Sequence, residues 1–314
     1  MMDVQVRRGP GWGDLRRKRV VLGVVWALFF AVSAGSAVQA ASAQAAQAPA
    51  PITDLRGHFT QGGLFFGRVP PGTRIFWGER AVPVTDNGEF AVGLDRDAPA
   101  AIELILIDPQ GRSSDVSYAI SQRSYNIQRV DGIARKIMSP NAEALERIRA
   151  EIAMVGEARA ARFARREFIE PFAWPLLGRI TGVFGSQRVY NGVPKRPHYG
   201  VDVAAPVGTP VRAPAGGVVT LAHADMFYSG GTLIIDHGYG LSSSFLHLSR
   251  LLVAEGDDIV QGQLIAEVGA TGRATGPHLD WRMNWHDQRV DPQLLVEPMA
   301  TALSRTNITG ITHD

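Results

Sequence analysis

Short hydrophobic runs that alternate with polar residues, separated by tight-turn residues, constrain the fold of this 314-residue chain most strongly. One such run, Ile-Glu-Leu-Ile-Leu-Ile at 102–107, lies between the turn signals Asp-Asn-Gly at 86–88 and Asp-Pro-Gln-Gly at 108–111. Period-two alternation bounded by Gly, Pro and Asn is typical of strands joined by turns. Since almost no long helical periodicity is visible from 178 to 295, the sequence predicts a mainly β fold.

Changes in this pattern divide the chain into parts. Residues 52–125 are expected to form a small, immunoglobulin-like β-sandwich, because short strands recur there at the spacing of a sandwich. A helical connector is predicted over 139–170, where Ser139 suits the N-cap and Pro140 the first helical position. Its many charges favour a solvated spacer. Residues 178–298 are expected to form a compact antiparallel β-sheet or barrel-like domain.

Residues 1–45 are expected to be a secretory signal peptide and the start of a linker. Basic residues at 16–19 precede an apolar run at 20–34, and small residues that suit cleavage follow from Ala41. The apolar run is short for a spanning helix, so no stable membrane span is expected after processing. The protein is therefore expected to be exported, to the periplasm first of all, although a freely secreted protein would have the same leader.

Charge and cysteine content exclude several other classes. The formal net charge of +2 comes from residues 1–40, and the remainder holds 26 basic against 28 acidic residues, so nucleic-acid binding is not expected. The chain has no cysteine, which excludes disulfides and a lipid-modified cysteine. A metal site here would consist of imidazole and carboxylate ligands.

Two pairs of potential metal ligands stand out. His198 and Asp202 flank Tyr-Gly-Val, where the glycine is expected to let the backbone fold so that both side chains converge. His278 and Asp280 lie two residues apart on a predicted strand, which places both on one face. Either pair could arise by chance, and a lone strand histidine such as His247 is more often a satisfied polar residue. Together they favour three ligands with an open fourth position, as in catalytic zinc sites.

From about residue 178 to 295 the chain resembles the lysostaphin/LytM-type zinc endopeptidases, which cut peptide bridges in bacterial cell walls. The segments that carry the resemblance follow one another in unbroken order: FGSQRV, HYGVDVAAPVGTPVRAPAGGVV, IIDHGYGLSSSFLHLS, VAEGDDIVQGQLIAEVGATGRATGPHLDW and RVDPQLL. The resemblance implies that His198 and Asp202 are ligands of one zinc ion. It implies that His278 and His247 are the catalytic pair, which polarise a water molecule and stabilise the oxyanion.

Asp280 departs from that family, which has the second histidine of an H-x-H motif as the third ligand. One hypothesis is that Asp280 still binds zinc. A second carboxylate would then cancel the charge of the ion and give weaker or more alkaline activity. The rival hypothesis is that Asp280 only orients His278 and that the metal site is impaired.

The resemblance implies a zinc-dependent endopeptidase that hydrolyses peptidoglycan crosslinks or stem peptides during cell-wall remodelling, with peptidoglycan as its partner. The alternative is a catalytically impaired relative that binds and activates a cell-wall amidase. The β-sandwich could contact other cell-wall enzymes. A third reading, a lipoyl-type carrier suggested by residues 255–265, is discounted because no lysine lies at a hairpin tip there.

Five other side chains have open or minor expected roles. His237 is expected at a hairpin tip, and an exposed His58 is expected to have no ligand role. Tyr199, Tyr228 and Trp281 could line a substrate groove or pack in the core.

Overall fold

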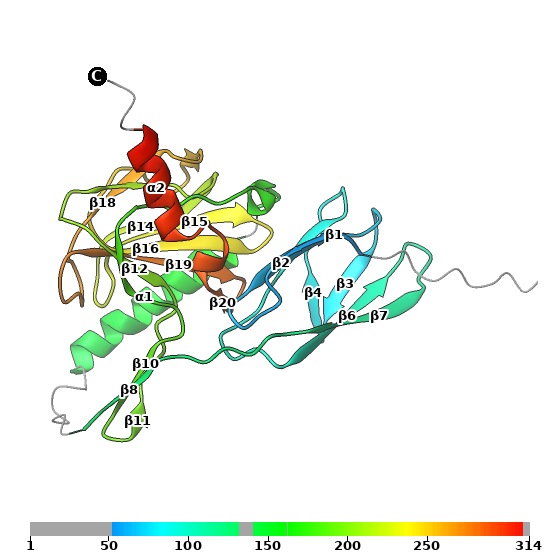
Figure 1. The fold of residues 1–314 in the computed structure, drawn as a ribbon, viewed down its shortest axis with the longest axis horizontal. Helices are drawn as coiled ribbons and strands as arrows, with labels where there is room; N and C mark the ends of the chain where they lie inside the picture. The colour runs from blue at the N-terminus through cyan, green and yellow to red at the C-terminus, as the bar shows by residue number, and fades with distance from the viewer. Residues whose placement is uncertain (1–51, 132–140, 162, 310–314) are drawn as a thin grey trace, which may run out of the picture. The chain divides into compact units, whose positions relative to one another are not determined.

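A computed structural model describes residues 52–131, 141–161 and 163–309. The predicted signal peptide at 1–45 and the predicted helix start at Ser139 and Pro140 lie outside these residues. The mainly β fold class is confirmed, since strands dominate the described chain (Figure 1). Of the two α-helices described, neither has the length and hydropathy needed to cross a bilayer.

Two antiparallel sheets form the part of the chain from 53 to 119. One sheet has the strand order β1-β2-β5 and the other β4-β3-β6-β7. In β6 the side chains of Ile102, Leu104 and Leu106 are buried while their neighbours are more exposed, so one face of that strand lies against the core. The bounds are β1 (Thr53–Gly57), β2 (Leu64–Arg68), β3 (Arg74–Trp77), β4 (Arg80–Val82), β5 (Glu89–Gly93), β6 (Ala101–Ile107) and β7 (Ser113–Ala119).

A short sheet and a helix follow. Strand β8 (Ile127–Val130) pairs in parallel with β10 (Gln187–Tyr190), which pairs antiparallel with β11 (Val193–Pro194). Helix α1 (Ala142–Ala160) begins after Asn141, whose side chain accepts a hydrogen bond of 2.9 Å from the Ala144 amide and so caps the helix. A 3-10 turn, η2 (Glu167–Ile169), follows the helix.

Helix α1 is anchored at few points, because most of its side chains are exposed. Val155 packs against Leu221, Met226 and Ile234 of the neighbouring sheet. The Glu151 carboxylate accepts hydrogen bonds of 2.8 and 3.0 Å from the Phe227 amide. These contacts hold the helix beside β14 and β15.

The C-terminal domain is one antiparallel sheet with ten strands. Its main order is β17-β14-β15-β16-β19-β12-β9, with β13, β18 and β20 paired to its members. The bounds are β9 (Arg179–Gly182), β12 (Val201–Ala204), β13 (Pro210–Arg212), β14 (Gly217–Met226), β15 (Gly230–Gly238), β16 (Leu241–Leu251), β17 (Asp258–Ile259), β18 (Leu264–Val268), β19 (His278–Trp285) and β20 (Gln288–Val290). The 3-10 turn η3 (Pro292–Leu294) and helix α2 (Met299–Thr309) follow, and the sequence pattern did not predict this helix.

Strand β19 separates the core from the polar side of this sheet. Its apolar side chains, at alternate positions, are fully buried: Leu279, Trp281, Met283 and Trp285. Trp281 is therefore a core residue. The intervening side chains are all polar: His278, Asp280, Arg282 and Asn284. Period-two alternation places these four on one face of the sheet.

The prediction of a hairpin tip at His237 is wrong. His237 lies in β15 and is fully buried. Its ring nitrogens lie 2.6 Å from the Gly216 carbonyl oxygen and 2.7 Å from Ser243 Oγ. The chain turns two residues later, where Tyr239 and Gly240 have φ angles of 49° and 84° in the left-handed region.

Candidate metal centre and active site

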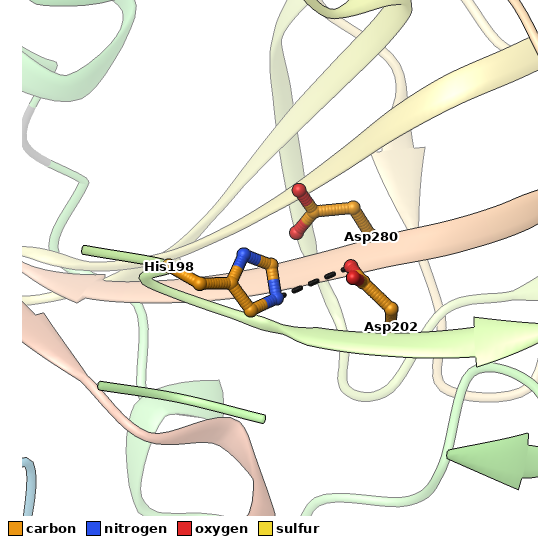
Figure 2. Close-up of side chains that lie close together, drawn as sticks. All are labelled: His198, Asp202 and Asp280. Carbon is orange, nitrogen blue, oxygen red and sulfur yellow. Dashed lines mark ion pairs between the residues drawn. The ribbon is translucent and has the colours of Figure 1, made fainter. Parts of the chain in front are cut away.

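Three side chains from separate segments converge beside β12 and β19. His198 precedes β12, Asp202 lies in β12 and Asp280 lies in β19. Asp202 and Asp280 are register partners in the antiparallel ladder, so their carboxylates project from directly opposed positions. One potential ligand atom from each of the three lies within 4.8 Å of the others, as Figure 2 shows.

Two buried atoms in this cluster lack a hydrogen-bond partner. His198 Nε2 lies 3.2 Å from Asp202 Oδ1, yet neither atom makes a hydrogen bond of acceptable geometry. Buried polar atoms nearly always have a partner, so two unpaired atoms here indicate a place for a bound group. The residues present therefore fit a divalent cation, since imidazole and carboxylate ligands suit zinc and two opposed carboxylates would otherwise repel each other.

The same carboxylates affect the protonation of His198. Burial by itself would lower the pKa of His198, but the neighbouring Asp202 and Asp280 outweigh burial and raise that pKa above its ordinary value. The cluster thus attracts positive charge, whether a proton or a metal ion.

Glycines make room for both carboxylates. A Cβ atom at Gly200 would lie 2.5 Å from Asp280 Oδ1, and one at Gly182 would lie 2.1 Å from Asp202 Oδ2. Gly200 has no left-handed φ, so the reason for glycine here is close approach and not the backbone freedom that the sequence suggested.

His247 and His278 lie beside this cluster, and each ring is anchored through Nδ1 to a backbone carbonyl. The Nδ1 atom of His247 is 2.9 Å from the Thr271 carbonyl oxygen, and that of His278 is 2.8 Å from the Gly276 carbonyl oxygen. A carbonyl oxygen only accepts, so each Nδ1 donates and each neutral ring keeps a lone pair on Nε2. The ring centroids are 4.8 Å apart, and His278 Nε2 is 3.9 Å from Asp202 Oδ1.

The backbone of His247 is unusual for a strand residue. Its φ angle is +66°, in the left-handed region that non-glycine residues seldom adopt. Its amide donates a hydrogen bond of 2.8 Å to the Ser229 carbonyl instead of continuing the ladder. Such conformations cost free energy and occur often at functional sites. Burial lowers the pKa of the His247 imidazole, so the neutral form is favoured at neutral pH.

Arg282 belongs to the same cluster, although it lies in none of the motifs that predicted the site. Its guanidinium donates to both oxygens of Asp280, with Nε at 2.9 and 3.1 Å and Nη2 at 2.5 Å. Burial alone would raise the pKa of Asp280, but Arg282 outweighs it and keeps the carboxyl ionised. The polar alternation of β19, followed two residues past Asp280, was the signal that could have identified it.

The ion pair between Arg282 and Asp280 changes the net charge expected at the metal site. An ion held by His198, Asp202 and Asp280 would be neutralised by two carboxylates, but Arg282 offsets one of them. The cluster with a divalent ion then has one net positive charge, which is the charge of a site with two imidazoles and one carboxylate. Asp280 is oriented by Arg282, while His278 is oriented by the Gly276 carbonyl.

A groove of about 1130 Å³ opens onto these residues. One wall is formed by side chains of α1, including the exposed Ile152 and the half-buried Arg159, and another by β10. The predicted site residues His198, Asp202, His247, His278 and Asp280 all line it, as does Tyr228. The structure therefore brings all five predicted residues together in one accessible groove.

Comparison with known proteins gives the class of this fold and site. Residues 196–292 match peptidase family M23. A solved structure described as a peptidase M23 from Pseudomonas aeruginosa is 30% identical to the chain, with a TM-score of 0.60, over 76% of this chain and 95% of that one. The chain therefore belongs to peptidase family M23, and the resemblance identified from its motifs is confirmed.

Two curated relatives match part of the chain. The peptidoglycan DD-endopeptidase ShyA of Vibrio cholerae is 37% identical over 129 residues, which cover 40% of this chain and 30% of the relative. The DD-carboxypeptidase/endopeptidase Mpg of Neisseria meningitidis is 39% identical over 130 residues, covering 41% of this chain and 29% of the relative. The chain thus spans about 30% of the length of these relatives.

Proposed function

We propose that this protein is a zinc-dependent endopeptidase that hydrolyses peptide bonds of peptidoglycan during cell-wall remodelling. The observation that carries the proposal is the convergence of His198, Asp202 and Asp280 on one point, with His247 and His278 beside it. Membership of peptidase family M23 and the activities named for the relatives from Vibrio and Neisseria support it.

One zinc ion would be held by His198, Asp202 and Asp280. It would supply Lewis-acid chemistry, polarising the scissile carbonyl and lowering the pKa of a water molecule. Arg282 keeps Asp280 ionised and fixed, so this third ligand is a carboxylate of defined orientation.

His247 and His278 would move protons during the reaction. Each ring is anchored through Nδ1–H to a carbonyl oxygen, so Nε2 is the atom free to accept a proton from the attacking water. The lowered pKa of His247 favours the neutral ring that a base requires. Once protonated, either ring can donate a hydrogen bond to the oxyanion or a proton to the leaving amine.

Metal content and digestion of purified peptidoglycan test the proposal together. The purified protein is expected to hold one zinc per chain and to release soluble peptide fragments, while His278→Ala keeps the zinc and loses activity. Asp280→Ala is expected to lose zinc. A protein without zinc or digestion that instead stimulates a cell-wall amidase would overturn the proposal in favour of an activator.

Export is part of the proposal, because peptidoglycan lies outside the cytoplasmic membrane. The basic and apolar leader at 1–45 supports it. Cell fractionation is expected to find the processed protein in the periplasm, and a full-length cytoplasmic protein would contradict this.

The two N-terminal sheets are proposed to contact other cell-wall enzymes.

A further inference from the structure

Three arginines gather next to the proposed metal centre. Tyr199 directly follows His198, and two guanidinium groups lie near its ring, with Arg196 Cζ at 5.6 Å and Arg289 Cζ at 5.8 Å from the ring centroid. Arg289 Nη1 also donates a hydrogen bond of 2.9 Å to Asn284 Oδ1, on the polar face of β19. The ring and this hydrogen bond hold two positive side chains beside a proposed zinc ligand.

Arg159 reaches the same place from helix α1. Its Nη2 donates a hydrogen bond of 3.0 Å to Ser244 Oγ, and Ser244 is the register partner of Arg282. Arg159 therefore lies over the polar face of the sheet, near Arg282. Arg159, Arg196 and Arg289, which we call the arginine cluster, all line the groove.

Two of these positive charges, on Arg159 and Arg289, are costly where they lie. Burial, followed by the charges of Arg196 and Arg282, outweighs the opposing effects of Tyr199 and Asp95 and lowers the pKa of Arg289 to about 10. Burial and the charges of Arg289, Arg282 and Arg196 lower the pKa of Arg159 well below its ordinary value. Like charges gathered in a partly buried groove disfavour the empty state and favour a bound anion.

The acidic groups of the groove do not balance the cluster. Seven arginine and lysine side chains line the groove, against three carboxylates. Asp280 is paired with Arg282 and Asp202 faces His198. Glu151 accepts hydrogen bonds from Arg147 and from the Phe227 amide. A zinc ion would add two further positive charges, so the excess is largest when the proposed enzyme is loaded.

We propose that the arginine cluster binds a carboxylate of the substrate, so that the groove selects peptides with a free carboxyl group close to the scissile bond. The planar guanidinium pairs with a carboxylate through two parallel hydrogen bonds, which gives orientation as well as affinity. The inference rests on the proposed endopeptidase activity and specifies its substrate as an anionic peptide. The ring of Tyr199 acts in this as a positioning residue for Arg196 and Arg289.

Two matched substrates test the proposal. One is a cross-linked peptide dimer with free carboxyl groups, and the other is the same dimer with those groups converted to carboxamides. The zinc-loaded protein is expected to cleave the free acid with a kcat/KM at least about tenfold higher, which is the value of one hydrogen bond to a charged group. Arg289→Gln and Arg196→Gln are expected to bring this ratio close to one, mainly by raising KM for the free acid.

Arg188→Gln is the matched control, because Arg188 lines the groove from β10 but is not among the charges that lower the pKa of Arg159 or Arg289. This variant is expected to keep the ratio. Equal cleavage of the two dimers by the unmodified protein would overturn the proposal. An equal fall of the kcat/KM ratio in the Arg289, Arg196 and Arg188 variants would do the same.

Binding separates a failure of this inference from a failure of the proposed activity. Titration calorimetry of zinc-loaded His278→Ala with each dimer is expected to show at least about tenfold tighter binding of the free acid. If neither dimer is cleaved but the acid still binds more tightly, the endopeptidase proposal fails and the carboxylate site stands. Equal binding of the two dimers would reject the carboxylate site whatever the activity.

Discussion

Two histidines of the C-terminal domain, His198 and His237, differ in what their ring nitrogens contact. His237 is fully buried, and both nitrogens have a neutral partner, the Gly216 carbonyl and Ser243 Oγ. His198 has a buried Nε2 without a hydrogen bond and faces two carboxylates. The first has the contacts of a structural residue, and the second has those expected of a metal ligand. The contacts of the ring, not its burial, separate the two roles.

Replacing each histidine by alanine is expected to have opposite effects on zinc binding and stability. The largest effect is expected at the proposed metal centre. His198→Ala is expected to lose bound zinc and at least about 1000-fold in the rate of peptidoglycan digestion. At alkaline pH, where the ring is neutral, the stability of the metal-free protein should change little, since the ring makes no hydrogen bond through Nε2. His58→Ala, at an exposed position, is the control that should behave like the unmodified protein. Retained zinc in His198→Ala would remove His198 from the proposed ligand set.

His237→Ala is expected to show the reverse behaviour. It should lower the free energy of unfolding by about 3 kcal/mol, because it leaves Ser243 Oγ and the Gly216 carbonyl without this partner and opens a cavity in the core. Urea unfolding measures the loss, and zinc bound per folded chain should stay at one. A variant that is stable but lacks zinc would contradict the distinction between the two histidines.

Acid should remove the stability that depends on a neutral His237. Burial lowers the pKa of His237 to about 4, from 6.5, and Glu167 and Arg165 are the charged groups that act on it. Since the unfolded chain binds a proton more readily, stability is complete above about pH 6.5 and falls as the pH drops toward 4. The expected loss from this group is about 2.5 kcal/mol by pH 4.5.

Urea unfolding at pH 7.5 and pH 4.5, compared between the unmodified protein and His237→Gln, isolates this contribution. The difference between the two proteins should shrink at the lower pH. A difference that does not change with pH would show that His237 titrates normally.

The smallest effect is expected from exchanging Asp280 for the residue that the wider family has there. Asp280→His removes one negative charge and leaves Arg282 as an uncompensated cation next to the ion. Zinc affinity, measured by competition with a chelator, should therefore fall about 10- to 100-fold. Asp280→His combined with Arg282→Gln should recover most of it. If the single variant binds zinc as tightly as the unmodified protein, Arg282 does not set the charge of the site.

The sequence was sufficient for the fold class and for the family. Alternation at 102–107 and in β19 identified strands because period two is a local property of the chain. The prediction that His198 and His278 lie in one site came from the order of the family's motifs along the chain. No local rule brings together residues eighty positions apart.

The role of Arg282 and the position of the turn after His237 were not predicted, because both depend on how the strands pair. Arg282 pairs with Asp280 two residues away. Period-two alternation puts both on one face, but it does not show that the two side chains pair. The turn at 239–240 is displaced because Gly238 still belongs to β15. Helix α1 has few apolar contacts, so nothing in its own sequence places it along the groove.

The opposed positions of Asp202 and Asp280 have a consequence for how the sheet assembles. A slip of one residue between β12 and β19 would turn one of the carboxylates to the other face and leave no pair of facing ligands. An ion can therefore bind tightly only to a chain whose strands are in the native alignment. By mass action, zinc would then raise the population of that alignment over every misaligned competitor, so the ion would select the correct strand pairing as the sheet forms.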